Sequence, residues 1–378
     1  MANLAQRRWR DEDWGADGRY HESGLILTGN AGNHDYVAKS LHNVQALEAS
    51  ATAHGHPVKR PVEVLATGED IKRVIRTGGT SGDTGYVNWN SGWVDAEASI
   101  VFLHKKLQSI GRVQFMTATV TNLLFDSSQD LVLGAQLDSG ENIRADLTIV
   151  AAGAWTPSLL DMRGIATSTG HVLGYTNLSS VDKNQLADIP VLLNISNGMF
   201  CIPPDNYNVL KVARHAYGYL NPTTIRNPEP HASQDKYITV SLPPINPPER
   251  LPLEGLRALY QFQQRVFPKL PFRYFDKTRI CWYTDTPTGD WIIDYHPSYS
   301  KSLFVATGGS GHAFKFLPVI GGKIVQHILG GLELEYIELW KWPVDRLDYS
   351  EWQGDGSRSG RKGMILEEEL KVGETPKL

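Results

Sequence analysis

The stretch that decides the fold runs from Leu303 to Ile328 and reads LFVATGGSGHAFKFLPVIGGKIVQHI. Leu303–Ala306 predicts a short strand, and Gly308–His312 predicts a glycine-rich turn. A helix is expected from Leu317, because its apolar residues recur on one face (Leu317, Ile320, Ile324 and Ile328). Such a unit can hold a phosphate or an electron-rich ring edge, since glycines permit close approach and a helix N-terminus offers free N–H groups. The same pattern also fits an ordinary α/β turn without a ligand.

A second α/β region precedes this stretch. Asp95 can cap a helix that Gly111 ends, and the apolar positions of that helix fall on one predicted face (Ala96, Ile100, Leu103, Leu107 and Ile110). The pattern then predicts strands at Val113–Val120, Leu131–Leu137, Asn142–Asp146 and Leu147–Val150. The last of these is continuously apolar, so we expect it to be buried on both faces of a layered domain.

Residues 170–280 differ in character from their surroundings. Proline-rich stretches alternate there with short strand patterns, which favours a mostly antiparallel sheet, with a helix at about Glu254–Val266. Nearer the N-terminus, Gly24–Thr28 predicts a buried strand and Gly68–Arg76 predicts a polar helix. The charged tail after Asp345 is expected to be loosely attached.

Composition narrows the class of protein. The 378 residues carry 37 basic and 41 acidic side chains, so the net charge of −4 gives no reason to bind nucleic acid or an anionic membrane. Hydrophobic residues make up 41%, which excludes a mostly disordered chain. Two cysteines exclude a disulfide framework and a four-cysteine zinc site. Without a long apolar run or a signal-peptide pattern, we expect a soluble intracellular protein of two domains.

Two more motifs precede the glycine turn, CWYTDTP at Cys281–Pro287 and WIIDYHP at Trp291–Pro297. Together with FVATGGSGHAFKFLPVIG they resemble the C-terminal flavin-binding signature of the monomeric sarcosine oxidase family. That family includes pipecolate and saccharopine oxidases and the fructosyl amino acid oxidases (amadoriases), which are FAD-dependent oxidases of secondary amines. The resemblance extends to residues 93–119, 145–155 and 197–215, and covers most of the chain from about residue 86 to 342.

The resemblance implies a fold class of α/β plus α+β. An FAD-binding domain of the glutathione-reductase-like, D-amino-acid-oxidase type would comprise residues 88–169 and 281–342. It would be interleaved with a mostly antiparallel substrate domain formed by residues 1–87 and 170–280. Residues 343–378 would form a C-terminal tail.

The resemblance also implies roles for single residues. Cys281 matches the cysteine that joins FAD covalently, Lys211 the lysine that serves oxygen near the flavin, and His215 a substrate-site histidine. Lys315 matches the lysine that pairs with the substrate carboxylate, and Tyr283 a substrate-pocket aromatic residue. From the residues alone, each has a structural alternative: a buried thiol, an edge-strand lysine, a surface histidine, a first-turn lysine and a core tyrosine.

The expected cofactor-binding set is larger. It comprises Cys281, Val120, Gly153, Trp155, Gly309, Ser310, Gly311, His312, Phe314 and Lys315. Phe200 is a weaker pocket candidate, and Cys201 is expected in the core. No metal is expected, because the nearest histidine pair, His54 and His56, fits an exposed loop.

One motif of the family is missing. The sequence contains no G-x-G-x-x-G turn for the FAD pyrophosphate: Gly354–Ser359 is a near miss in the tail, and Gly78–Gly85 has the wrong spacing. We therefore expect that the chain lacks the first βαβ unit, whose strand would lie at the centre of the parallel sheet. Flanking apolar strands would be exposed, and the polypeptide would hold FAD poorly. Ala313 also stands where many relatives carry glycine.

These observations predict an oxidase of a secondary amine of an amino acid, such as pipecolate, saccharopine or sarcosine, giving an imine and hydrogen peroxide. The alternatives are a fructosyl amino acid oxidase and an inactive remnant that cannot hold FAD. The expected partners are an amino-acid-derived amine and oxygen, and the chain is expected to be a monomer that binds neither nucleic acid nor membrane. Pro376–Leu378 resembles a peroxisomal address, with the cytoplasm as the alternative.

Overall fold

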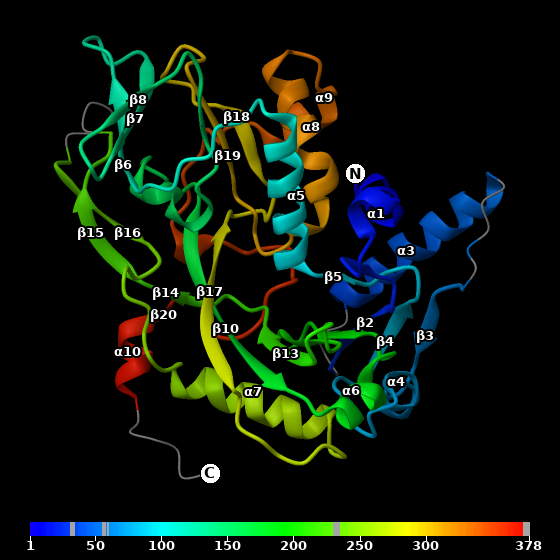
Figure 1. The fold of residues 1–378 in the computed structure, drawn as a ribbon. Helices are drawn as coiled ribbons and strands as arrows, with labels where there is room; N and C mark the ends of the chain where they lie inside the picture. The colour runs from blue at the N-terminus through cyan, green and yellow to red at the C-terminus, as the bar shows by residue number, and fades with distance from the viewer. Residues whose placement is uncertain (31–34, 55–57, 59, 230–234, 373–378) are drawn as a thin grey trace.

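The computed structural model describes residues 1–30, 35–54, 58, 60–229 and 235–372 (Figure 1). His56 and Pro376–Leu378 lie outside the described residues. The helices are α1 (Ala2–Arg10), α2 (Glu12–Gly15), α3 (Asp35–Ala53), α4 (Gly68–Ile75), α5 (Ala96–Ile110), α6 (Ser180–Leu186), α7 (Leu253–Val266), α8 (Leu317–Ile328), α9 (Leu334–Trp340) and α10 (Leu366–Lys371), with short 3-10 turns η1 (Gly153–Ser158), η2 (Ala313–Phe316) and η3 (Tyr349–Glu351). None of the described helices is both long enough and apolar enough to cross a membrane.

Half of the described strands belong to a ten-stranded sheet. Its order is β20-β14-β10-β13-β12-β11-β2-β4-β3. The tenth strand, β17, pairs with β10, which therefore has three neighbouring strands (β13, β14 and β17). Its strands are β2 (Leu25–Gly29), β3 (Glu63–Leu65), β4 (Thr84–Asn88), β10 (Thr167–Asn177), β11 (Val191–Asn194), β12 (Met199–Ile202), β13 (Val209–Arg214), β14 (Tyr219–Leu220), β17 (Lys277–Asp285) and β20 (Met364–Ile365). All pairs within residues 167–285 of this sheet are antiparallel, in agreement with the predicted character of that region.

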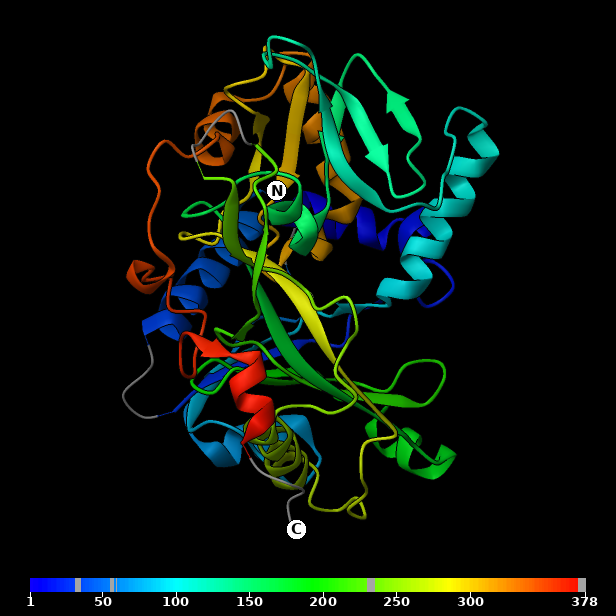
Figure 2. The ribbon, with the colours of Figure 1, turned by 90° about the vertical axis from the view of Figure 1, so that its left-hand side faces the viewer.

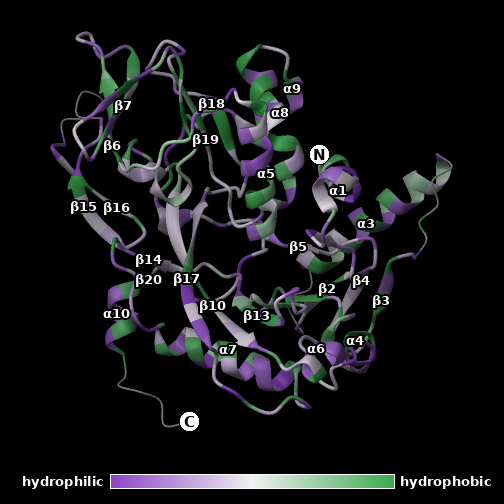
Figure 3. Ribbon diagram, in the orientation of Figure 1, coloured by the Kyte–Doolittle hydropathy of each residue, from purple (hydrophilic) through white to green (hydrophobic). Residues whose placement is uncertain are grey.

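The remaining strands form smaller sheets. β18 (Ile292–Tyr295), β19 (Leu303–Thr307) and β9 (Thr148–Val150) form one three-stranded sheet, and β6 (Val120–Phe125), β7 (Val132–Leu137) and β8 (Asn142–Arg144) form another. Two-stranded pairs join β1 (Tyr20–His21) to β5 (Trp93–Val94) and β15 (Pro222–Arg226) to β16 (Tyr237–Ser241). Figure 3 shows hydrophobic residues along β18 and β19, the strands that lie between α8 and η1.

Separate cores lie in these sheets. One packs α4 and α7 against a face of the ten-stranded sheet, two surround β18, β19 and β9, and smaller ones lie under α3 and along β16. The fold is therefore mixed α/β, as predicted. The predicted domain boundaries at residues 88, 170 and 281 stay a prediction.

Several elements agree with the sequence patterns. α5 begins after Asp95, whose side chain accepts a hydrogen bond from the Ala98 amide, and ends at Gly111 in the left-handed region. α4, α7 and α8 occupy their expected positions, and Ile320, Ile324 and Ile328 of α8 pack against a core. Local capping and periodicity determine where these helices lie.

Two predictions near the smaller sheets are wrong. Of Val113–Val120, only the last residue belongs to a strand, because residues 112–119 pair with no described strand. β9 pairs with β19 on one side alone, and Ile149 is 47% exposed, so this strand is not buried on both faces. The predicted face of α5 is also largely uncovered, since Ile100 and Ile110 are exposed.

The C-terminal segment, residues 346–372, is not loosely attached. β20 adds a parallel strand to the ten-stranded sheet beside β14, and Trp352, Met364 and Leu366 are buried. Figure 2 shows β20 and α10 lying against α7, and contacts between α10 and α7 agree with that view. The prediction rested on the charged composition of this segment and overlooked the few apolar residues that anchor it.

Candidate active site

Two strands of the ten-stranded sheet, β13 and β17, carry predicted site residues on one face, and β10 lies between them. On β10, Tyr175 lies opposite Lys211 on one side and His171 lies opposite Cys281 on the other. Residues two apart along a strand share a face, so Tyr283 joins this group. Lys211, Cys281 and Tyr283 therefore lie on one face of the sheet, which we call the site face.

The opposite face explains why these polar residues point where they do. Val172, Leu210, Val212 and Ile280 alternate with the site residues and pack in the core beneath α7. Cys201 is buried in the same core, as expected, and burial raises the pKa of its thiol to about 12.

Lys211 carries a charge without a counter-charge. Its Nζ lies 5.9 Å from the centre of the Phe200 ring, and it makes no ion pair or hydrogen bond with the described residues. Burial lowers the pKa of Lys211, while nearby Cys281 and Arg279 act on it in opposite directions. An ammonium in this setting is suited to stabilise a negative charge brought by a ligand.

Lys315 lies in η2, after the glycine turn. Its carbonyl oxygen accepts a hydrogen bond of 2.7 Å from the Trp9 indole, which ties α1 to η2. Its Nζ lies 5.2 Å from the centre of the Phe316 ring, and no described carboxylate pairs with it. The side chain is accessible to solvent, yet the surrounding protein lowers its pKa by desolvation. Lys315 is thus a second cation available to an anionic ligand.

The glycine turn packs on Tyr283. Gly311 has a φ of +71°, and a Cβ added there would clash with the Tyr283 ring, so this position requires glycine. Ser310 reaches β17 by donating its amide hydrogen to the Thr284 carbonyl at 2.9 Å. The structure therefore brings the turn and the site face together.

The other predicted cofactor residues are more spread out. His312 is hydrogen-bonded through Nε2 to the Gly289 carbonyl at 2.8 Å, and Phe314 stacks on Trp9 at 6.4 Å between ring centres. Gly309 lies in the turn itself, while Gly153 and Trp155 lie in η1. Hydroxyls of Thr156 and Thr307, 3.0 Å apart, hold η1 beside the strand that leads into the turn. Val120 begins β6 in a separate sheet.

A buried polar network joins these groups, and the sequence analysis missed it. Arg358 donates from Nη2 to the Asp285 carboxylate at 2.5 Å and to the Ser310 carbonyl at 2.8 Å. Its guanidinium lies 5.2 Å from the centre of the Tyr283 ring. Thr169 donates to the other Asp285 oxygen at 2.5 Å and lies 2.9 Å from Nε2 of His171, which stacks on Tyr283 at 3.9 Å.

Burial and charge determine the protonation of this network. Burial raises the pKa of the Asp285 carboxyl, although Arg358 opposes the shift. Burial, followed by the charge of Arg358, lowers the pKa of His171 and of His215 well below the usual value. Both imidazoles are therefore neutral at pH 7, and desolvation keeps Tyr283 protonated by raising its pKa.

Part of the network left a signal in the sequence. Thr167, Thr169 and His171 are polar residues two apart, a pattern typical of a strand face that is not apolar core. No sequence pattern indicated Arg358, because it reaches Asp285, 73 residues earlier in the chain, only through the folding of the C-terminal segment.

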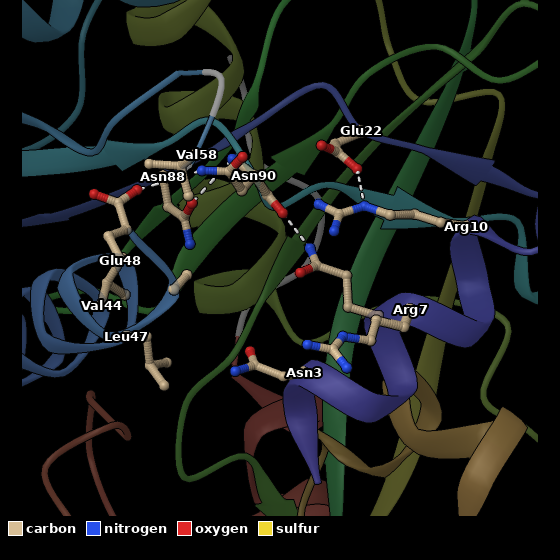
Figure 4. Close-up of a pocket in the computed structure, with 12 residues that line it drawn as sticks. Asn3, Arg7, Arg10, Glu22, Val44, Leu47, Glu48, Val58, Asn88 and Asn90 are labelled. Atoms are coloured by element: carbon tan, nitrogen blue, oxygen red, sulfur yellow. Dashed lines mark hydrogen bonds and ion pairs between the residues drawn. The ribbon is translucent and has the colours of Figure 1, made fainter. Parts of the chain in front are cut away.

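A cavity of about 750 Å³ lies between α1 and α3 (Figure 4). Its charged side chains are largely paired: Arg10 with Glu22 at 2.7 Å, and Glu48 with the Val62 amide and with the Asn90 side chain. None of the predicted site residues lines it. The cavity is therefore separate from the Tyr283 group.

The sequence analysis took His54 and His56 as part of an exposed loop and not as a metal site, and of these two residues the structure describes His54. His54 follows α3 in an exposed position, and its Nδ1 is 2.7 Å from the Ser50 carbonyl. Among the described residues, no three His, Cys, Asp or Glu side chains form a group that could hold a metal ion.

Comparison with known proteins places this geometry in context. Residues 1–327 match the family described as FAD dependent oxidoreductase. Amino acid oxidase imqH of Aspergillus flavus is 29% identical over 91% of this chain and 82% of its own length. L-saccharopine oxidase of Schizosaccharomyces pombe is 27% identical over 68% of this chain and 60% of its own length.

Among solved structures, the fructosamine oxidase Amadoriase II of Aspergillus fumigatus superposes with a TM-score of 0.79 at 26% identity. The match covers 98% of this chain and 82% of that one. The fold thus matches an FAD domain joined to a substrate domain, and the resemblance noted in the sequence is confirmed. The chain belongs to the FAD dependent oxidoreductase family, and is related to amino acid, saccharopine, sarcosine and fructosamine oxidases.

Proposed function

We propose that this chain is an oxidase of a secondary amine of an amino acid, which produces an imine and hydrogen peroxide. The observation that carries the proposal is a pair of ammonium groups, those of Lys211 on the site face and of Lys315 after the glycine turn, which have no anionic partner among the described residues and whose pKa values are lowered by desolvation. For Lys211, which is partly buried, a cation held without a counter-ion is costly unless a ligand supplies the negative charge.

The described residues fit the ring end of FAD better than its pyrophosphate end. The glycine turn, the site face and η1 present backbone and cations beside Tyr283, as a flavin ring would require. The sequence has no G-x-G-x-x-G turn for the pyrophosphate. When bound, FAD would accept a hydride equivalent from the carbon next to the amine and pass electrons to oxygen.

Each cation then has a distinct task. Lys315 would pair with the substrate carboxylate, and this ion pair would orient the amine. Lys211, on the site face, would stabilise the negative charge that oxygen acquires with its first electron, because a fixed cation needs no reorganisation. The neutral imidazole of His215 would leave the amine in its reactive, uncharged form by adding no positive charge beside it.

Cys281 is proposed as the covalent tether of the flavin. It lies on the site face opposite His171, and its side chain is partly accessible. The other cysteine, Cys201, is enclosed in the core. Denaturing the FAD-loaded protein in acid tests this role: flavin should stay with the wild-type precipitate and be released from a Cys281→Ser variant.

A second candidate is a fructosyl amino acid oxidase, which the similarity to Amadoriase II favours. Peroxide release from pipecolate, saccharopine, sarcosine and fructosyl-lysine separates the two. Lys315→Met should raise the KM of any carboxylate-bearing substrate, whereas the matched control Lys341→Met, an exposed lysine paired with Glu338, should not. Peroxide from none of the amines, with FAD supplied, would instead favour an inactive protein.

A further inference from the structure

The carboxylate of Asp285 is a buried charge to which the proposed function assigns no role. Asp285 ends β17 on the site face, two residues beyond Tyr283, and its side chain is 12% exposed. One carboxylate oxygen accepts a hydrogen bond from Arg358 Nη2 at 2.5 Å, and the other accepts one from the Thr169 hydroxyl at 2.5 Å. Both oxygens are therefore engaged, each by a different part of the chain.

Arg358 joins the C-terminal segment to the glycine turn. Besides binding Asp285, it donates to two backbone carbonyls, to that of Ser310 from Nη2 at 2.8 Å and to that of Ala216 from Nη1 at 3.1 Å. Its side chain is 11% exposed, and a guanidinium removed from water in this way requires a counter-charge. Asp285 supplies that charge, so the position of Arg358 depends on it.

The glycine turn depends on Arg358, because one residue of the turn is strained. Ser310 has a φ of +45°, a left-handed conformation that a residue with a side chain rarely adopts. Such a conformation persists only where its surroundings hold it. Here the Ser310 amide donates to the Thr284 carbonyl at 2.9 Å, and the Ser310 carbonyl accepts from Arg358. β17 and the C-terminal segment together hold the turn.

Asp285 reaches Tyr283 by a second route. Thr169, which donates to Asp285, lies 2.9 Å from Nε2 of His171, and His171 stacks on the Tyr283 ring at 3.9 Å. The Arg358 guanidinium lies 5.2 Å from the centre of the same ring. One carboxylate therefore supports two of the groups that surround Tyr283.

We propose that Asp285 is a positioning residue of the candidate active site. Through Arg358 it holds the glycine turn, and through Thr169 it holds the imidazole that is stacked on Tyr283. The turn leads directly into η2, so its position also determines that of Lys315. This role deepens the proposed function and rests on it for the task of Lys315, whereas the positioning itself does not depend on amine oxidation.

Hydrogen exchange of the full chain, measured by mass spectrometry, tests the positioning without turnover. Asp285→Ala removes the carboxylate, and we expect amides of residues 308–313 and 346–362 to exchange faster by about tenfold or more, as loss of charge-assisted hydrogen bonds predicts. Formate is a carboxylate small enough for the space that alanine leaves, and its binding should restore slow exchange to Asp285→Ala. Chloride at equal ionic strength should not restore it.

Two further variants complete this test. Asp182→Ala removes half of a comparable ion pair in α6, that with Arg273 at 2.7 Å, and should leave exchange in both segments unchanged. Asp285→Asn keeps the shape of the side chain but offers one acceptor oxygen where two are used, so it should speed exchange in the same segments. This variant carries the test if Asp285→Ala does not fold. Wild-type exchange in Asp285→Asn, or fast exchange in Asp285→Ala that formate does not slow, overturns the inference.

Kinetics distinguish positioning from a general loss of stability. In the FAD-loaded protein, Asp285→Asn should raise the KM of the amine by about tenfold and change kcat less, because a displaced turn moves Lys315 away from the substrate carboxylate. Asp182→Ala should change neither value. An unchanged KM in Asp285→Asn contradicts the positioning of Lys315 by this carboxylate.

The two kinds of measurement separate this role from the proposed function. Peroxide release from an amine, with wild-type exchange in Asp285→Asn, leaves amine oxidation standing and removes the role of Asp285. Exchange that formate restores in Asp285→Ala, with no peroxide from any amine, leaves the role of Asp285 standing and removes the oxidase.

Discussion

Lys211 shows how much one residue's position depends on its neighbours. In the sequence it interrupts an apolar strand, which fits an edge strand as well as an active site. The structure gives β13 neighbours on both sides, β10 and β12, so an edge position is excluded. Lys211 points away from the apolar core because the residues on either side of it, Leu210 and Val212, point into that core.

At this scale, we expect Lys211→Met to slow the reaction with oxygen by roughly 10²-fold, as removal of one preorganised electrostatic group usually does. Stopped-flow reoxidation of the reduced, FAD-loaded protein measures this step separately from amine oxidation. Lys315→Met is the matched control, since it should raise the KM for the amine and leave reoxidation unchanged. Normal reoxidation in Lys211→Met would remove its proposed role.

The buried histidines predict a pH dependence of stability. Burial lowers their pKa values well below the usual histidine value of about 6.5 in the folded state, so the unfolded chain binds more protons below that pH. Their contribution is fully present above about pH 6.5 and is lost as the pH falls below it. The melting temperature should therefore fall between pH 7 and pH 5, and less steeply in His171→Gln, which cannot take up a proton.

The positions of the candidate residues could be predicted where a motif carried them, while their roles stay predictions. Cys281, Tyr283 and Lys315 lie in continuous motifs: Tyr283 contacts the glycine turn, Lys315 follows it, and Cys281 lies two residues from Tyr283 on β17. Arg358 and Thr169 act through contacts with residues far away in the chain, and no local pattern reports such contacts.

Among the elements, α5 shows that capping residues determine where a helix begins and ends, whereas they do not determine whether its apolar face is buried. Its limits follow from Asp95 and Gly111, and they were predictable to the residue. Its apolar residues share one face, yet Ile100 on that face is 47% exposed. Periodicity indicates which side of a helix is apolar, but not whether another element lies against it.

A matched pair of helix variants tests this difference. Ile100→Ala should change the free energy of unfolding by about 0.5 kcal/mol or less, as is usual for surface positions. Ile71→Ala in α4, at a side chain with 0% exposure, should cost about 2–5 kcal/mol. Urea unfolding measures both. A large loss in Ile100→Ala would show that α5 is covered in solution.

For the whole molecule, many of the exposed apolar residues lie between residues 100 and 155. Ile100 and Ile110 of α5, Phe115 and Met116 in the unpaired stretch after it, and Ile149 at the open edge of β9 are all exposed. Exposed apolar residues and an open strand edge both favour association with other chains.

We therefore expect the isolated polypeptide to bind a hydrophobic dye strongly and to hold FAD below one molecule per chain. The reason is the lack of a G-x-G-x-x-G turn for the pyrophosphate, together with the uncovered residues around β9. Absorbance of flavin released on denaturation gives the ratio, and dye fluorescence gives the exposure. A protein purified with stoichiometric flavin would contradict this expectation.

Overall architecture was predictable to the level of fold class. Helix and strand patterns, together with the flavin-site motifs, indicated a mixed α/β protein with an antiparallel region inserted. The close packing of residues 346–372 was not predictable, because two strand residues, Met364 and Ile365, are too few to give a pattern.

The pairing of β20 with β14 has a consequence for synthesis. Tyr219 of β14 lies opposite Met364 of β20. After β14 has been synthesised, about 145 more residues must follow before β20 can pair with it and complete this edge of the large sheet. Arg358 reaches Asp285 under the same constraint. The binding site can therefore close only near the end of translation, and a nascent chain stalled before that point would present an unfinished sheet edge to chaperones.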